Sequence, residues 1–170
     1  MTAQSPPDSP AVVIVVDVAN VMGARADGWW RDRAGAALRL CREVGALAAR
    51  GIPRDRLSSG GLSSGGLSSE GLPSECASSA GPSSAPAFPR YVLVLEGRAR
   101  EAAGRIDSAN PRTRIVQAPG SGDDTIVAES AAAVAGEASC LAVTADRELR
   151  ERCRGVGAAV RGPGWLLDLL

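Results

Sequence analysis

The chain has 170 residues, a length typical of one domain. It contains no His, and all 19 of its basic residues are Arg, which excludes Ser-His-Asp and Cys-His catalysis, histidine zinc sites, Schiff bases and Walker A phosphate loops. The acidic residues balance this charge, and a net charge of zero gives no argument for broad nucleic-acid binding. The four Cys form no CxxC pair, which argues against a zinc framework and a disulfide scaffold.

The N-terminal part of the chain predicts a tail, a strand and a helix. Residues 1–10 are rich in Ser and Pro and are expected to be a disordered tail. Residues 11–16 (AVVIVV) have the continuous β-branched pattern of a strand buried on both faces of a parallel sheet. That run is too short for a signal peptide or a membrane span, so we expect a cytoplasmic protein without a membrane segment. Residues 29–50 predict a helix that has Trp30 on its apolar face and ends at Gly51.

A low-complexity segment interrupts the chain at residues 57–89. It is rich in Ser, Gly, Pro and Ala and contains the tandem repeat LSSGG, LSSGG, LSSEG, LPSEC. A solenoid needs more stacked units than this to bury an apolar face, so the composition favours a flexible insertion. We therefore predict a single domain over residues 11–170 that carries a flexible insertion.

The second half alternates strands with helices. Strands are expected at 91–95, 113–118, 140–144 and 156–160, and helical segments at 98–104, 122–135, 146–154 and 165–170. This alternation predicts right-handed crossovers and a three-layer α/β fold around a mainly parallel sheet.

Acidic residues follow the strands of this predicted sheet. They are Asp17, Glu96, the pair Asp123 and Asp124, and Asp146. Each Asp has a simpler interpretation as a helix cap, and Glu96 as an ion-pair partner of a nearby Arg. Together they predict a divalent-cation site, because carboxylates gathered at one crevice repel each other unless a cation neutralises them. Oxygen ligands indicate Mg²⁺ or Mn²⁺.

Three blocks of the sequence resemble the signature blocks of NYN-domain proteins, which belong to the PIN-like metal-dependent ribonucleases. They are VVDVANVMG (15–23), GSGDDTIVAES (120–130) and VTADRELRERC (143–153), and the ending RGPGWLLDLL (161–170) is in keeping with the bacterial branch. The resemblance spans the predicted domain outside the insertion. It implies a PIN-like fold of the Rossmann-like type.

The resemblance also implies roles for single residues. Asp17, Asp123 or Asp124, and Asp146 match the metal-binding aspartates, which would make Asp17, Asp123 and Asp146 the catalytic set. Asn20 matches the polar residue that accompanies the first aspartate, and Thr144 would support Asp146 or a metal-bound water. Glu96 is a further candidate ligand that the resemblance does not align.

The leading hypothesis is a nuclease that cleaves RNA, with single-stranded RNA as the expected substrate if Trp29 and Trp30 stack on bases. Arg25 and Arg147, with Arg31 and Arg33, are candidate phosphate-binding residues. Two alternatives stay open. One is a nucleotide phosphohydrolase, such as a nucleoside-triphosphate pyrophosphohydrolase, on the same acidic site. The other is a non-catalytic module that binds RNA or protein.

Overall fold

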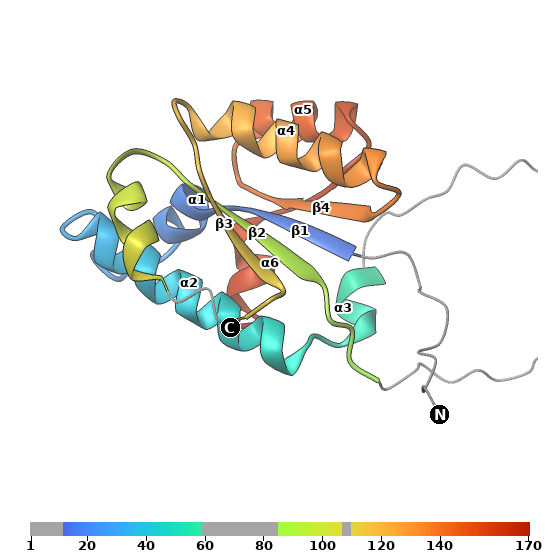
Figure 1. Ribbon diagram of the computed structural model, residues 1–170, viewed down its shortest axis with the longest axis horizontal. Helices are drawn as coiled ribbons and strands as arrows, with labels where there is room; N and C mark the ends of the chain where they lie inside the picture. Colours follow the sequence, from blue (N-terminus) through green and yellow to red (C-terminus); the bar gives the residue numbers. More distant parts are fainter. Residues whose placement is uncertain (1–11, 59–84, 107–109) are drawn as a thin grey trace, which may run out of the picture.

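The computed structural model describes residues 12–58, 85–106 and 110–170, and within these residues five strands form one sheet (Figure 1). The strands are β1 (Val12–Asp17), β2 (Arg90–Leu95), β3 (Thr113–Gln117), β4 (Ser139–Val143) and β5 (Ala159–Arg161). Their order is β3-β2-β1-β4-β5, and every neighbouring pair is parallel. The predicted parallel sheet is confirmed.

The central strand β1 is buried on both faces because its apolar run continues without a break. Ile14 and Val16 pack into the core on one face of the sheet, and Val15 packs into the core on the other. Side chains of a strand alternate between faces, so an unbroken β-branched run supplies both layers at once.

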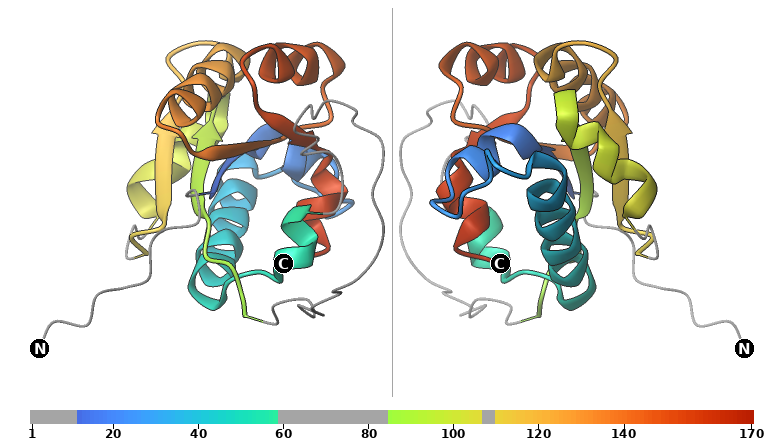
Figure 2. Two further views of the ribbon diagram at one scale, coloured as in Figure 1. Left: turned by 90° about the vertical axis from the view of Figure 1, so that its right-hand side faces the viewer. Right: turned by 90° about the vertical axis from the view of Figure 1, so that its left-hand side faces the viewer.

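Helices cover both faces of the sheet (Figures 1 and 2). One face carries α4 (Gly122–Ala135) and α5 (Arg147–Gly155). The other carries α1 (Val18–Gly23), α2 (Arg33–Arg50), the 3₁₀ helix η1 (Gly97–Arg105) and α6 (Pro163–Leu167), with the short α3 (Arg54–Ser58) beside them. The three-layer α/β prediction is confirmed.

The strand order places a topological switch at the middle of the sheet. From β1 the chain moves outward through β2 to β3, and it then returns by α4 to add β4 and β5 on the other side of β1. Right-handed crossovers in opposite directions put their helices on opposite faces. The chain therefore turns toward one face of the sheet after β1 and toward the opposite face after β4. Open parallel sheets bind ligands beyond the C-terminal ends of the strands at such a switch point.

The predicted helix over 29–50 begins later than expected, at Arg33. Asp32 caps it, and its Oδ1 accepts a hydrogen bond of 2.8 Å from the Gly35 amide. The two tryptophans therefore precede the helix. Trp29 packs against the core, whereas Trp30 is 57% exposed, so the prediction that Trp30 is a core residue was wrong.

Short elements account for the other differences from the predicted boundaries. The helices α1 and α3 were not predicted. The helical segment expected at 98–104 is a 3₁₀ helix over Gly97–Arg105, the strand expected at 156–160 is Ala159–Arg161, and the turn expected at 165–170 is Pro163–Leu167.

Both ends of the predicted insertion belong to the folded part. Leu57 in α3 packs against the core, and Ala87 forms a two-way backbone bridge with Ile52, with N···O distances of 2.8 Å. Residues 59–84, like the predicted tail at 1–10, lie outside the described residues. Among the helices that the structure describes, none has the length and apolarity that a bilayer crossing requires.

Candidate functional site

The acidic residues named from the sequence lie where strands end and helices begin. Asp17 ends β1 and caps α1, and Asp146 follows β4 and caps α5. Glu96 follows β2, and the pair Asp123 and Asp124 stands in the first turn of α4. Because the strands are parallel, all of these positions belong to the C-terminal edge of the sheet.

Asp17 is the buried carboxylate of this edge, with 6% of its surface exposed. Its Oδ1 accepts a hydrogen bond from the Asn20 amide at 3.0 Å, and its Oδ2 accepts from Asn20 Nδ2 at 2.8 Å and from Thr144 Oγ1 at 2.9 Å. Burial raises the pKa of Asp17 because it removes water from the charged form, and these hydrogen bonds oppose that rise. The side chain is thus fixed in position and costly to ionise.

Thr144 joins Asp17 to Asp146. In the register of β1 and β4, Val16 lies opposite Val143, so the residues that follow them, Asp17 and Thr144, lie side by side. The Thr144 hydroxyl donates to Asp17 and accepts the amide N–H of Asp146 at 3.2 Å. Asp146 Oδ1 accepts from the Leu149 amide at 2.7 Å, which orients the exposed carboxylate over the first turn of α5.

Glu96 reaches across the edge to the start of α4. Its Oε2 accepts a hydrogen bond of 2.7 Å from the Gly122 amide. A Cβ at residue 122 would lie 2.7 Å from the same oxygen, so glycine is the residue that permits this approach. Gly122 was not among the residues predicted for this site. The position could have been found from the sequence, because a glycine is unfavourable in the first turn of an otherwise Ala-rich helix and its presence there needs a reason.

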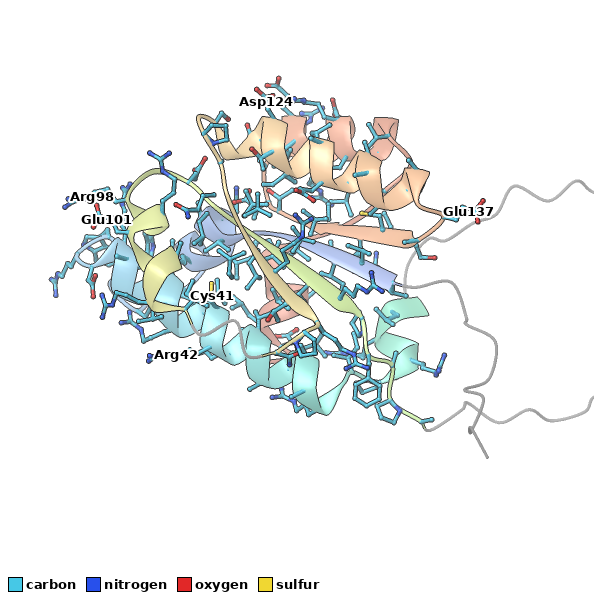
Figure 3. All side chains as sticks on the ribbon, in the orientation of Figure 1. Cys41, Arg42, Arg98, Glu101, Asp124 and Glu137 are labelled. Atoms are coloured by element: carbon cyan, nitrogen blue, oxygen red, sulfur yellow. The ribbon has the colours of Figure 1, made fainter. Side chains whose placement is uncertain are left out.

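The two carboxylates of the Asp123–Asp124 pair have different surroundings. Asp124 is 80% exposed and forms an ion pair of 2.6 Å with Arg152 of α5. Figure 3 shows it on the outer side of α4, away from the sheet. Asp123 is partly buried and lies within electrostatic reach of the other carboxylates. Arg152 was missed because nothing in the sequence indicates which residues α4 and α5 bring together.

Negative charge accumulates around Asp123. Partial burial is the main reason that its pKa is raised, and the charge of Asp17 is the next. Asp146 and Glu96 raise the pKa further, while Arg152 lowers it. Asp17, Glu96, Asp123 and Asp146 therefore form one electrostatically coupled group, which we call the acidic edge.

The acidic edge has the donor chemistry of a Mg²⁺ or Mn²⁺ site, because its side chains offer carboxylate oxygens. Its mutual repulsion is of the kind that a divalent cation relieves. As the side chains stand, however, no three acidic or thiol groups within residues 12–58, 85–106 and 110–170 converge closely enough to enclose a metal ion. Asp17, Asp146 and Glu96 are each held by helix amides instead.

Two of the four arginines named as phosphate-binding candidates, Arg25 and Arg147, differ in how far their charge is already paired. Arg25 forms an ion pair with Glu43 of α2, so its charge is already partly engaged. Arg147 is the first residue of α5 and is 94% exposed, with Glu151 at 3.6 Å. Arg147 therefore stands next to Asp146 with its guanidinium in solvent.

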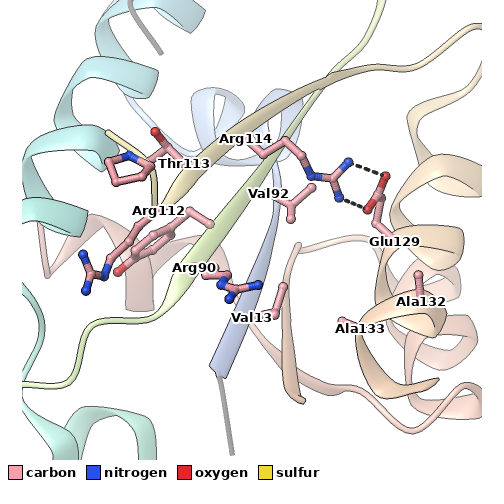
Figure 4. Close-up of a pocket in the computed structure, with 11 residues that line it drawn as sticks. Val13, Arg90, Val92, Arg112, Thr113, Arg114, Glu129, Ala132 and Ala133 are labelled. Atoms are coloured by element: carbon pink, nitrogen blue, oxygen red, sulfur yellow. Dashed lines mark hydrogen bonds and ion pairs between the residues drawn. The ribbon is translucent and has the colours of Figure 1, made fainter. Parts of the chain in front are cut away.

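Hollows lie at both edges of the sheet. A hollow of about 440 Å³ opens beside Asn20 and Ala145, next to the acidic edge. Another of about 440 Å³ lies at the N-terminal ends of the strands (Figure 4). It is lined by Arg90, Arg112 and Arg114, of which Arg114 is paired with Glu129.

Comparisons with known proteins show a similarity of fold. No protein-family model matches the sequence, and no curated protein matches it. Among solved structures, the crystal structure of a point mutant of Rae1 (YacP) from Bacillus subtilis is similar, with a TM-score of 0.55 and 12% sequence identity. The similarity covers 92% of this chain and 74% of that chain. With the all-parallel sheet and helices on both faces, it supports a PIN-like fold.

Proposed function

We propose that this protein is a metal-dependent phosphodiesterase that cleaves RNA at the acidic edge. The observation that carries the proposal is the chain of hydrogen bonds from Asp146 through Thr144 to Asp17 at the topological switch of the sheet. The three sequence blocks that resemble NYN-domain proteins converge there, since they contribute β1 and α1, the start of α4, and the end of β4 with α5. That resemblance supports RNA as the substrate.

In this proposal the side chains of the acidic edge bind the cation and hold it in place. Asp17 is fixed by Asn20 and Thr144, and Asp146 by its own helix, while Asp123 completes the set by turning toward them. A Mg²⁺ or Mn²⁺ ion held there would supply charge stabilisation at the phosphate and would lower the pKa of a water molecule toward neutrality. The hollow beside Asn20 and Ala145 would receive the scissile phosphate, and the exposed Arg147, two residues after Ala145, is the candidate to bind it.

The absence of a preassembled metal cluster in the described residues favours the non-catalytic module, and the zero net charge favours a small nucleotide substrate. Both are therefore tested beside the nuclease. Release of pyrophosphate from nucleoside triphosphates without cleavage of polymers would favour the nucleotide phosphohydrolase. RNA binding without turnover, unchanged by EDTA and by Asp17→Asn, would favour the binding module.

The decisive experiment compares two neighbouring carboxylates. The full chain is incubated with single-stranded RNA, duplex RNA and DNA in Mn²⁺, Mg²⁺ or EDTA, and products are resolved on gels. We expect cleavage that EDTA abolishes. Because groups that merely support metal ligands contribute about 10- to 100-fold, Asp123→Asn should lower the rate by about 100-fold or more. Asp124→Asn, which removes a carboxylate bound to Arg152, should stay within about threefold of the parent.

A result in which the two variants lose activity equally would contradict the assignment of Asp123. Metal-independent cleavage, or cleavage retained by Asp17→Asn, would contradict the proposed function itself.

A further inference from the structure

An aromatic and basic hollow lies at the same end of the molecule as the acidic edge. Its volume is about 390 Å³, and its lining includes Trp30, Arg31 and Arg33 on one side and Arg98 and Glu101 on the other. We call it the Trp30 hollow. Figure 3 shows Arg98 and Glu101 on η1 at this end. The volume falls in the range of small-ligand sites.

Both walls of the Trp30 hollow belong to segments that follow residues of the acidic edge along the chain. One wall is the end of the loop that follows α1, the helix capped by Asp17, together with the first residues of α2. The other is η1, which begins at Gly97 immediately after Glu96. A ligand in this hollow therefore lies on the chain segments that leave the acidic edge.

A turn places the two tryptophans in different surroundings. The Arg31 amide donates to the Gly28 carbonyl at 3.0 Å, which places Trp29 and Trp30 at the centre of a four-residue turn. Trp29 packs against the core near Gly23, and its ring meets Trp30 edge-on, with centroids 6.3 Å apart. Trp29 thus anchors the turn, and Trp30 is held with 57% of its surface in solvent.

Three arginines line the hollow beside this exposed indole. The Arg31 guanidinium lies over the Trp30 ring at 6.0 Å, and the Arg33 guanidinium lies over Trp29 at 5.3 Å. Arg98 is 81% exposed, with Glu101 at 3.7 Å. Asp32 contributes negative charge, but its carboxylate caps α2. A flat aromatic surface among guanidinium groups matches a nucleobase with its flanking phosphates.

We propose that Trp30 is the stacking platform for an unpaired base of single-stranded RNA, and that Arg31, Arg33 and Arg98 bind its phosphates. This inference rests on the proposed function for its choice of polymer. It adds where the strand is held and why an unpaired strand is required, because a base inside a duplex is already stacked on both faces and cannot offer its face to Trp30. A free nucleotide carries the same chemistry and is distinguished by the test.

The test measures binding without cleavage. Anisotropy of a labelled ten-nucleotide RNA is followed in EDTA with the full chain, beside a duplex of the same sequence and unlabelled mononucleotides as competitors. Loss of one stacked base weakens binding by about fivefold or more, which we expect for Trp30→Ala with the single strand. Trp30→Phe should recover most of this affinity, and duplex binding should not change.

Phe88→Ala provides the matched control. Phe88 is also exposed, at 47%, and also lies under a guanidinium, that of Arg112 at 5.2 Å. It lies just before β2, near the opposite edge of the sheet. Thermal melting confirms that each variant is folded. Equal losses for Phe88→Ala and Trp30→Ala, or no loss for Trp30→Ala, would overturn the inference.

The binding, competition and cleavage measurements together distinguish this inference from the proposed function. If mononucleotides compete as strongly as the oligonucleotide at the same concentration of nucleotides, the hollow is a site for a free nucleotide, and the inference of a bound RNA strand is overturned. Trp30-dependent binding in a protein that never cleaves RNA would refute the proposed function and keep this inference. Metal-dependent cleavage of RNA together with RNA binding that does not depend on Trp30 would support the proposed function and overturn this inference.

Discussion

Asp123 carries a testable pH dependence. Its folded pKa is raised above the ordinary value of 3.8, first by burial and then by neighbouring carboxylates, so the folded chain binds this proton more tightly than the unfolded chain. Its contribution to stability is therefore greatest at low pH and is lost as the pH rises through the raised folded value. In EDTA, we expect the stability of the parent relative to Asp123→Asn to fall as the pH rises above the ordinary carboxyl value, and to stay level once the pH exceeds the raised folded pKa.

Denaturant unfolding of both chains across this pH range measures the trend. Added salt should shrink it, because salt screens the repulsion from Asp17, Asp146 and Glu96, but burial is the larger cause and is not screened. A relative stability that rises with pH would show that folding does not raise the pKa of Asp123.

The positions of the acidic residues could be predicted from the sequence because each follows a recognisable strand or opens a recognisable helix. Their contacts could not. The bond between Thr144 and Asp17 joins residues 127 positions apart and depends on the register of β1 with β4. The role of helix cap and the role of site residue also do not exclude each other here. Asp17 and Asp146 accept hydrogen bonds from backbone amides of their helices and still belong to the acidic edge. Local pattern alone cannot separate the two roles.

At the scale of elements, the end of α2 depends on one glycine. Gly51 has φ 76° and ψ 176°, a region that other residues scarcely adopt, and a Cβ there would lie 2.8 Å from the Ala87 carbonyl oxygen. We expect Gly51→Ala to lower the free energy of unfolding by about 2–4 kcal/mol. Gly45, in the interior of the same helix, has open space around its Cβ position, so Gly45→Ala should raise it by about 0.5–1 kcal/mol.

Chemical denaturation of the two variants beside the parent checks this pair. Equal effects of the two substitutions would contradict the conformational role of Gly51.

Element ends that carry a strong stop signal were predictable, and short elements were not. Gly51 marked the end of α2 correctly. Its start was predicted too early because Trp29 and Trp30 continue the apolar pattern, whereas the structure begins the helix where Asp32 can cap it. The helix α1 has six residues, too few to show a helical period, and its cap at Asp17 was its main signal.

At the scale of the whole molecule, the alternation of strands and helices predicted the three layers, but it did not determine the order of the strands. The order β3-β2-β1-β4-β5 follows from which strands pair, and those pairs join residues far apart in the chain. This order makes β1 and β4 neighbours and so creates the switch point at which Asp17 meets Thr144. The carboxylates depend on this long-range pairing for their assembly.

The low-complexity segment is expected to contribute nothing to this assembly. Its two ends are tied to the fold by the Ile52–Ala87 bridge and by Trp165, whose Nε1 donates to the Arg56 carbonyl in α3 at 3.1 Å. Replacing residues 60–83 with a ten-residue Gly/Ser linker preserves both ties and shortens the loop. Loop-closure entropy then predicts an unfolding free energy equal to the parent's or up to about 1 kcal/mol higher.

RNA cleavage by this shortened chain should equal that of the parent, measured in the same assay. A longer deletion, over residues 54–87, removes both ties and should lower the unfolding free energy by about 2 kcal/mol or more, since it exposes Ile52 and leaves backbone and indole donors without their partners. Loss of folding in the shorter deletion would show that residues 60–83 pack on the domain. Loss of activity alone would show that they contact the RNA.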